Sequence, residues 1–268
     1  MAKYIKAVRN YMIKKLNRNE PKNREKEISV GAHLKELRYT IIGCLTVVVS
    51  GSAVCYGFFR AQLMELFTNP LDGLNVPIIY TSVTESFTTE MKVGIIAGII
   101  ATSPIIVFLI WRFVGPALFP KEKRQLMLCI PIAVLLFGGG VCFCYFIIFP
   151  FALRFFLSTA SVDLEAMLTI GDYVNFLCKI LVPFGLIFET PLIVYFLVGF
   201  RIIPLERLKK ARKYILLVCF IIGAIITPPD VVSQLSVAGP MYLMYEIGML
   251  VGVIAEKYKA RDSAKAIV

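Results

Sequence analysis

The sequence predicts an all-α integral membrane protein with six transmembrane helices, whose N- and C-termini both lie on the cytoplasmic side. Three observations support this fold class. The chain of 268 residues is 58% hydrophobic, only 18% of its residues are charged, and its mean hydropathy is +0.76. Six apolar runs follow one another along the chain, and lysine and arginine gather in alternate connections between them. A soluble domain of this length would carry more charge and a smaller apolar fraction.

Each predicted span is an apolar run with polar or charged residues on both sides. A run of about 20 residues is long enough to cross the hydrocarbon of a bilayer as a helix. The basic leader before the first run is too long for a cleavable signal peptide, so we interpret that run as a retained helix. Prolines inside the runs bend a membrane helix where neighbouring groups satisfy the freed backbone. The six runs cover residues 39–59, 93–113, 126–149, 173–198, 214–227 and 235–255.

The fifth run, 214–227, is shorter than a bilayer requires. As a helix it covers about 21 Å, against about 30 Å of hydrocarbon. Two interpretations remain: a short hairpin that crosses and thins the bilayer locally, or a re-entrant hairpin that never crosses. Both return the chain to the side from which it came. We favour the crossing hairpin because the partner run, 235–255, is long enough to span.

Lysine and arginine are divided very unevenly between the two sides of the predicted bundle. The leader before the first run holds eleven, and the connections after the second and fourth runs hold three and six. The tail after the last run adds four, so 24 of the 29 fall on one side. By the positive-inside rule this side faces the cytoplasm. The chain thus divides into a basic cytoplasmic leader (1–32), a six-helix transmembrane domain (33–256) and a cytoplasmic tail (257–268).

Several classes of function find no support in the sequence. The net charge of +11 is spread over alternate loops without an aromatic-interleaved basic face, so we expect no nucleic acid as a partner. The seven cysteines lie mostly inside apolar runs and predict no disulfide framework, and the single histidine, His33, excludes a multi-histidine metal site. Motifs for a nucleophile, a phosphate loop or a metalloprotease do not occur. We therefore expect no enzyme, no cofactor and no metal.

Ionisable residues inside the apolar runs are candidates for function, because each costs about 2.5–3.5 kcal/mol at bilayer depth. Glu189 lies between Pro183 and Pro191, where the helix should break, and we expect it to face the bundle interior or a water-filled recess. Lys179 lies about 15 Å along the helix and about 80° around it, so a direct pair is not expected. Glu246 is either functional or a helix-end carboxylate near an interface. The alternative function at this point is a small-molecule or ion permease that uses Glu189 and Lys179.

Acidic residues are few on the basic side, and two of them stand close to predicted spans. Glu36 precedes the first span, and Glu122 precedes the third. The simplest interpretations are a solvated charge for Glu36 and complementarity to the helix dipole for Glu122. A functional interpretation requires a cationic partner, because a carboxylate can bind a guanidinium group bidentately. Composition alone favours the simplest interpretations.

Short motifs stand in a fixed order along most of the chain, from Gly31 to Lys257. They are HLKELR (33–38), WRFVGPAL (111–118, running to 122), YFIIFP (145–150), FETP (188–191), LERLKKARKY (205–214), TPPD (227–230) and PMY (240–242, continuing to 248). Each motif is weak alone, but seven in order are highly specific. Together they make the chain similar to TatC, the multispanning receptor subunit of the twin-arginine protein translocase.

The resemblance implies a fold and a function. TatC proteins have six helices with both ends cytoplasmic, bent into a cup-like concave bundle whose fifth and sixth helices are short, and this favours the crossing hairpin. They recognise the paired-arginine signal peptide of folded precursor proteins and nucleate the transport complex, which the proton-motive force drives. The resemblance thus implies a core component of the twin-arginine translocase.

The resemblance also implies roles for individual residues. The implied signal-peptide site consists of Glu36, Glu122, Phe113 and Arg38. Glu189 matches the intramembrane glutamate of the family, which is linked to the concave face and to partner contact. Asp230 matches the acid of the outer turn, beside Pro228.

The implied partners are single-span TatA- and TatB-type subunits, twin-arginine signal peptides of folded cargo, the lipid bilayer, and further copies of the chain within the complex. The implied location is the cytoplasmic (inner) membrane, as a multi-pass protein. The chain departs from the family pattern at Leu109, where glutamine is frequent, and at Tyr39, where a basic residue is frequent. It also departs at Lys179, where an apolar residue is usual. The long leader has no counterpart, and its simplest role is a flexible tail on anionic lipid.

Overall fold

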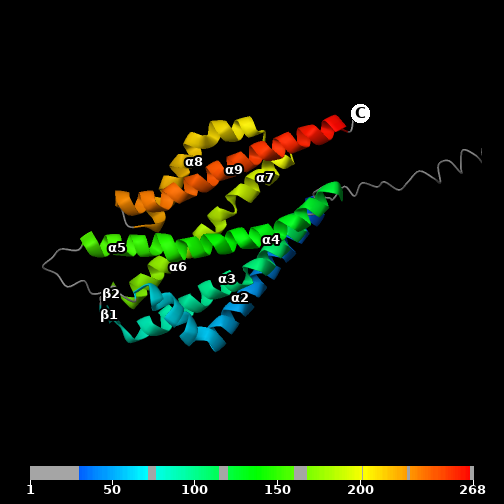
Figure 1. Ribbon diagram of the computed structural model, residues 1–268. Coiled ribbons are helices and arrows are strands. Elements are labelled where there is room, and N and C mark those ends of the chain that lie inside the picture. Colours follow the sequence, from blue (N-terminus) through cyan, green and yellow to red (C-terminus); the bar gives the residue numbers. More distant parts are fainter. Residues whose placement is uncertain are drawn as a thin grey trace, which may run out of the picture. The chain divides into compact units, whose positions relative to one another are not determined.

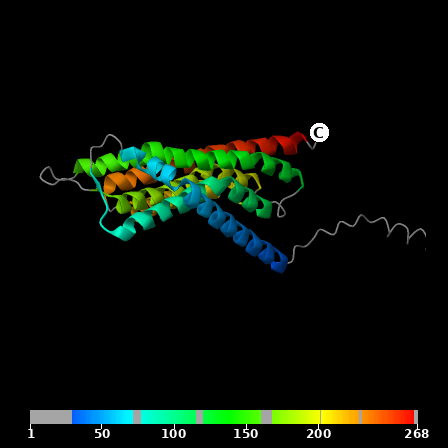
Figure 2. The ribbon, with the colours of Figure 1, turned by 90° about the horizontal axis from the view of Figure 1, so that it is seen from below.

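The computed structural model describes residues 30–71, 77–114, 120–159, 168–200, 202–227 and 230–265. In these residues the chain is almost entirely helical (Figure 1, Figure 2). It divides into two compact units, residues 1–39 and 40–268, and helix α2 belongs to both. The predicted leader lies outside the described residues up to residue 29.

The first two apolar runs form helices that are longer than the runs themselves. Helix α2 covers Val30–Thr68 and leads into the 3₁₀ turn η1 (Asn69–Leu71), while α3 covers Val83–Val114 with Pro104 inside it. Both exceed the about 20 residues that the hydrocarbon requires. Apolarity marks only the part of a helix that lies in lipid, whereas backbone hydrogen bonding continues the helix through the polar residues at its ends.

The third apolar run forms a continuous helix of three segments. These are α4 (Pro120–Phe143), the π-helical turn η3 (Cys144–Ile148) and α5 (Phe149–Thr159). The wide turn stands directly before Pro150, whose ring would clash with the carbonyl of residue 146 and whose nitrogen donates no hydrogen bond. Widening the helix there separates the ring from the carbonyl, so that the helix continues past the proline.

The fourth apolar run is broken at Glu189, as the sequence predicts. Its helices are α6 (Ile170–Phe188) and α7 (Thr190–Gly199). Pro191 has no N–H with which to bond the carbonyl of residue 187, so the regular ladder stops there. The amide of Glu189 donates instead to the carbonyl of Leu186 at 3.2 Å, and the carbonyl of Glu189 accepts from the amide of Leu192 at 3.0 Å. The break therefore follows from the proline spacing.

Two short strands place the beginnings of α3 and α6 side by side. Strands β1 (Ile78–Ile79) and β2 (Leu168–Thr169) pair in parallel, with Ile78 opposite Leu168 and Ile79 opposite Thr169. Helix α3 begins four residues after β1, and α6 begins directly after β2. The two helices therefore leave the same end of the second unit.

The last two helices also differ from the predicted boundaries. Helix α8 covers Leu205–Ile226 and α9 covers Val231–Lys265, whereas the apolar runs predicted 214–227 and 235–255. Helix α8 has 22 residues because strong helix formers in its first half extend it beyond its apolar half. Helix α9 continues past residue 256, where the predicted transmembrane domain ends. The short fifth run is thus the apolar half of a longer helix.

The core of the second unit is built around α6, which packs against α3 and α4, while α9 packs against α7 and α8 (Figure 1). Leu177, Ile180 and Phe184 of α6 are fully buried. Their spacing of three and four residues places them on one face of the helix. Phe149, at the start of α5, is also fully buried and belongs to the same cluster.

One glycine lets α4 and α6 approach closely. A Cβ atom on Gly140 would lie 2.6 Å from the carbonyl oxygen of Phe184, which is too short for any side chain. Gly138 and Gly139 have nothing within 4 Å of the same position in the described part of the chain. Of the three adjacent glycines, Gly140 is therefore the one that packing requires.

Five helical stretches of the described chain are long and apolar enough to cross a membrane: Leu34–Leu71, Val83–Phe113, Cys129–Ser158, Ile170–Gly199 and Val231–Lys257. Helix α8 is not among them, because its first half is rich in lysine and arginine. Large apolar side chains such as Leu135 and Ile225 are 75% exposed, as expected for a surface in contact with lipid. The described fold is that of a nearly all-helical membrane protein, and the count of six spans stays a prediction.

Candidate functional site

Glu189 is placed at the helix break by the two helices that it joins. Its side chain is half-buried, and its Oε1 atom is buried without a hydrogen-bond partner among the described residues. A buried polar atom without a partner destabilises the fold and is rare in native proteins. The expectation that Glu189 is a polar position turned away from lipid stays a prediction, as does its role.

Asp230 caps the first turn of α9. Its carboxylate accepts a hydrogen bond from the amide of Ser233 at 2.7 Å, and a second from the Ser233 hydroxyl. Because both donors stabilise the charged form, the hydroxyl most, the pKa of Asp230 lies below its ordinary value of 3.8. On the other side of the turn, Thr227 ends α8, and its hydroxyl donates to the carbonyl of Gly223 at 2.9 Å. Pro228 lies outside the described residues.

A polar cluster joins α8 to α9 near Glu246. The guanidinium of Arg212 donates to Oε2 of Glu246 at 2.8 Å, and the hydroxyl of Tyr242 donates to Oε1 at 2.7 Å. The neighbouring Tyr245 donates from its hydroxyl to the carbonyl of Leu208 at 2.6 Å. Glu246 is therefore part of a helix-joining ion pair. The sequence did not predict this pair, because its members are 34 residues apart.

Glu85 links the beginnings of α3 and α6. Its Oε2 accepts from the amide of Thr81 at 2.7 Å and from the Thr81 hydroxyl, and its Oε1 accepts from the amide of Gly171 at 2.8 Å. A Cβ atom on Gly171 would lie 2.6 Å from Oε1, so the glycine makes room for this contact. Sequence reasoning missed this site. The capping-box spacing from Ser82 to Glu85 signals the start of α3, but it does not reveal the link to α6.

The residues predicted to bind the signal peptide belong to both compact units of the chain. Glu36 is half-buried and Arg38 is exposed, and both belong to the part of α2 in the first unit. Phe113 is half-buried near the end of α3, in the second unit. The backbone of Glu122 lies in the first turn of α4, and its side chain lies outside the described residues. The geometry of this group as a site therefore stays a prediction.

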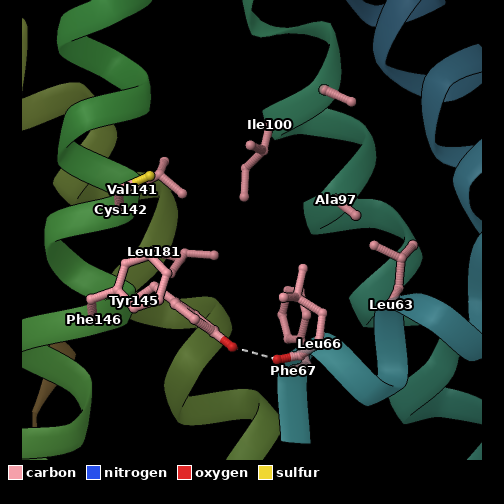
Figure 3. A pocket seen from close by; sticks show the side chains of 11 residues that line it. Leu63, Leu66, Phe67, Ala97, Ile100, Val141, Cys142, Tyr145, Phe146 and Leu181 are labelled. Atoms are coloured by element: carbon pink, nitrogen blue, oxygen red, sulfur yellow. Dashed lines mark hydrogen bonds between the residues drawn. The ribbon is translucent and has the colours of Figure 1, made fainter. Parts of the chain in front are cut away.

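An apolar pocket of about 310 Å³ lies between α2, α3, α4, η3 and α6 (Figure 3). The hydroxyl of Tyr145 points across it and donates to the carbonyl of Leu66 at 2.5 Å. No charged side chain of the described chain lines the pocket, so it suits an apolar group alone. Its lining residues are Leu63, Leu66, Phe67, Ala97, Ile100, Ala101, Val141, Cys142, Tyr145, Phe146 and Leu181. None of the predicted site residues lies there.

Metal chemistry finds no support in the described part of the chain, where acidic residues, cysteines and histidine form no group of three that could hold an ion. The cysteines described are all free thiols. Of these, Cys129, Cys144 and Cys219 are buried, whereas Cys142 is exposed.

Comparison with known proteins gives consistent matches over most of the chain. The model of the family "Sec-independent protein translocase protein (TatC)" matches residues 32–240. A TatC protein of Carboxydothermus hydrogenoformans is 40% identical over 228 residues, which are 85% of this chain and 93% of that protein. TatCy of Bacillus subtilis is 34% identical, covering 89% of this chain and 94% of its own length.

Structural comparison agrees with the sequence matches. A crystal structure described as the twin-arginine translocase receptor TatC superposes with a TM-score of 0.77 at 36% identity. The match covers 83% of this chain and 99% of the other. The permease alternative loses its basis, because family and fold point to protein translocation. The chain belongs to the TatC family of Sec-independent protein translocase proteins.

Proposed function

We propose that the chain is the signal-peptide receptor and core subunit of a twin-arginine translocase, and that it acts by binding and assembly without covalent catalysis. The observation that carries this proposal is the match of residues 32–240 to TatC together with the likeness to a solved structure described as the receptor. It recognises the paired arginines of folded precursor proteins and nucleates the transport complex. The proton-motive force drives transport.

The proposed topology has six spans in the cytoplasmic (inner) membrane, with both termini cytoplasmic and a cup-like concave bundle. Support comes from the lysine and arginine asymmetry and from the five qualifying helices. The apolar half of α8 supplies the remaining span. It is too short for an unperturbed bilayer, so it thins the membrane locally. Helix α8 packs along α9, which is long enough to hold it in place.

The proposed recognition site uses Glu36 and Glu122 as acceptors for two guanidinium groups. Both carboxylates stand in a surface rich in lysine and arginine, so they offer the local attraction for a cationic pair. Arginine is favoured over lysine because its planar fork matches a carboxylate bidentately. Phe113 supplies an aromatic surface beside the site. Arg38 is the fourth residue proposed to bind the signal peptide.

The proposed assembly site is centred on Glu189. Its buried Oε1 atom lacks a partner among the described residues, and a polar group from a single-span TatA- or TatB-type subunit would supply one. Further copies of the chain complete the transport complex. The break between α6 and α7 keeps the position open to such a contact, because the local backbone no longer forms a regular helix.

Crosslinking to a twin-arginine precursor tests the recognition site. Glu36→Ala combined with Glu122→Ala should abolish the crosslink, because each arginine loses its carboxylate. Glu256→Ala is the matched control: it removes an exposed glutamate of α9, and the crosslink should persist. A precursor with two lysines in place of the arginines should bind weakly to the wild-type protein. Unimpaired binding by the double variant would refute the site.

A further inference from the structure

We propose that Lys92, Asn175 and Lys179 bind the phosphate headgroup of an anionic phospholipid, in the membrane leaflet next to the β1–β2 pair. These side chains lie on α3 and α6, away from the proposed recognition and assembly sites. The proposal does not depend on the function proposed above. It assigns a role to Lys179, a charge inside an otherwise apolar run.

The three side chains gather at one level of the second unit. Nζ of Lys92 donates to Oδ1 of Asn175 at 2.7 Å, which joins α3 to α6. Lys179 follows Asn175 by one helical turn, so their Cβ atoms are about 5–6 Å apart on one face of α6. The level is fixed by the strand pair and by Glu85, which accepts from the amide of Gly171. Both lysines are exposed, and Asn175 is half-buried.

The cluster offers hydrogen-bond donors and positive charge. Asp172 lies two turns from Lys179, too far for an ion pair, and its Oδ2 accepts from the hydroxyl of Thr169. Neither lysine belongs to the ion pairs Arg60–Glu90 and Arg212–Glu246. Because Lys92 occupies Oδ1 of Asn175, the groups left to a ligand are two ammonium groups and one amide NH₂. Such a donor set binds an anion.

The depth of the cluster matches the headgroup region. Helix α3 is about 48 Å long, and α6 together with α7 is about 45 Å long. If each is centred on about 30 Å of hydrocarbon, about 8–9 Å of helix extends beyond the hydrocarbon at each end. Lys92 and Lys179 each follow the first residue of their helix by nine positions. Their Cα atoms then lie about 4–6 Å inside the hydrocarbon. A lysine side chain of about 6 Å carries its ammonium group back to the interface.

A phospholipid fits these features better than a carboxylate of another protein chain. The ammonium groups reach the level at which phosphates lie, and two cations flanking an amide can surround one phosphodiester. Leu186 follows Lys179 by two turns on the same face of α6, and it is 60% exposed. This apolar surface continues away from the headgroup and accommodates an acyl chain.

Titration of the purified full-length protein with phosphatidylglycerol, followed by native mass spectrometry, tests the proposal. The double variant Lys92→Gln with Lys179→Gln should bind about thirtyfold more weakly, and each single variant about fivefold more weakly. Lys92→Arg with Lys179→Arg should keep the affinity, because the charge remains. Arg154→Gln is the matched control, since it removes one exposed cation from α5 without touching the cluster. Millimolar inorganic phosphate should not displace the lipid.

Three results would overturn the proposal. The first is unchanged phosphatidylglycerol binding by the glutamine double variant. That result would mean that the two lysines bind a carboxylate of another protein chain and not a lipid phosphate. The second is an equal loss in Arg154→Gln, which would mean that any surface cation serves. The third is displacement by inorganic phosphate, which would mean that the acyl chains contribute nothing. If the double variant aggregates, the single variants and the arginine pair decide the question.

Discussion

Asp230 shows how a single side chain can hold the turn between α8 and α9. Its carboxylate accepts from both the amide and the hydroxyl of Ser233, and it thereby satisfies a donor at the N-terminus of α9. The resemblance to TatC implies that this acid belongs to the outer turn. Its contacts supply a structural reason for the residue, independent of any role in transport.

Replacement of Asp230 should lower stability in a pH-dependent way. Asp230→Ala should cost about 1 kcal/mol at neutral pH, because α9 loses its N-cap. The pKa of Asp230 is depressed below 3.8 in the folded protein, so the contribution of its charge is present above that value. It is lost as the pH falls through the folded pKa. Thermal unfolding in detergent at several pH values measures this.

Asp230→Asn provides the matched comparison for the charge. Asparagine is also a good N-cap residue, so this variant should keep most of the stability at neutral pH. It should lack the pH dependence that the carboxylate provides. Equal stability of wild type and Asp230→Ala at neutral pH would show that the cap contributes nothing.

Contacts between helices depend on a few single residues, which the lengths of the apolar runs in the sequence do not reveal. At α4 and α6 the position is Gly140, which stands against the backbone of Phe184. At α8 and α9 it is the ion pair of Arg212 with Glu246, whose side chains are 48% and 29% exposed. An exposed pair of this kind contributes little stability in water, so its main effect is to fix how the two helices face each other.

Alanine substitution distinguishes the packed glycine from its neighbour. Gly140→Ala should destabilise the protein by about 1–3 kcal/mol, because the new methyl group meets a backbone carbonyl that cannot move freely. Gly139→Ala is the matched control and should be neutral or stabilising, because the space beside it is open and alanine favours a helix. Thermal unfolding of the two variants in the same detergent gives the comparison. Equal melting temperatures would contradict the close contact.

Much of the whole fold could be predicted from the sequence, and the exceptions have physical causes. The break at Glu189 was predictable because Pro191 removes a local hydrogen bond. The length of α8 was not, because hydropathy overlooks a charged first half that still favours a helix. The contact between Glu85 and Gly171 joins residues 86 positions apart, which one sequence cannot reveal. The sequence thus predicts the effect of a proline on its own helix, but it does not predict which distant residues contact each other.

At the scale of the whole molecule, the proposed assembly site predicts that Glu189 connects the fold to transport. Glu189→Ala should insert normally into the membrane, because the break is made by Pro191, but it should reduce export of a folded twin-arginine reporter to a small fraction of wild type. The physical reason is that a partner subunit loses the polar group that it would contact at bilayer depth. Complementation of a translocation-deficient strain gives the export measurement. Leu186→Ala, at an exposed position one turn earlier, should export normally. Wild-type export by Glu189→Ala would leave Glu189 a packing role alone.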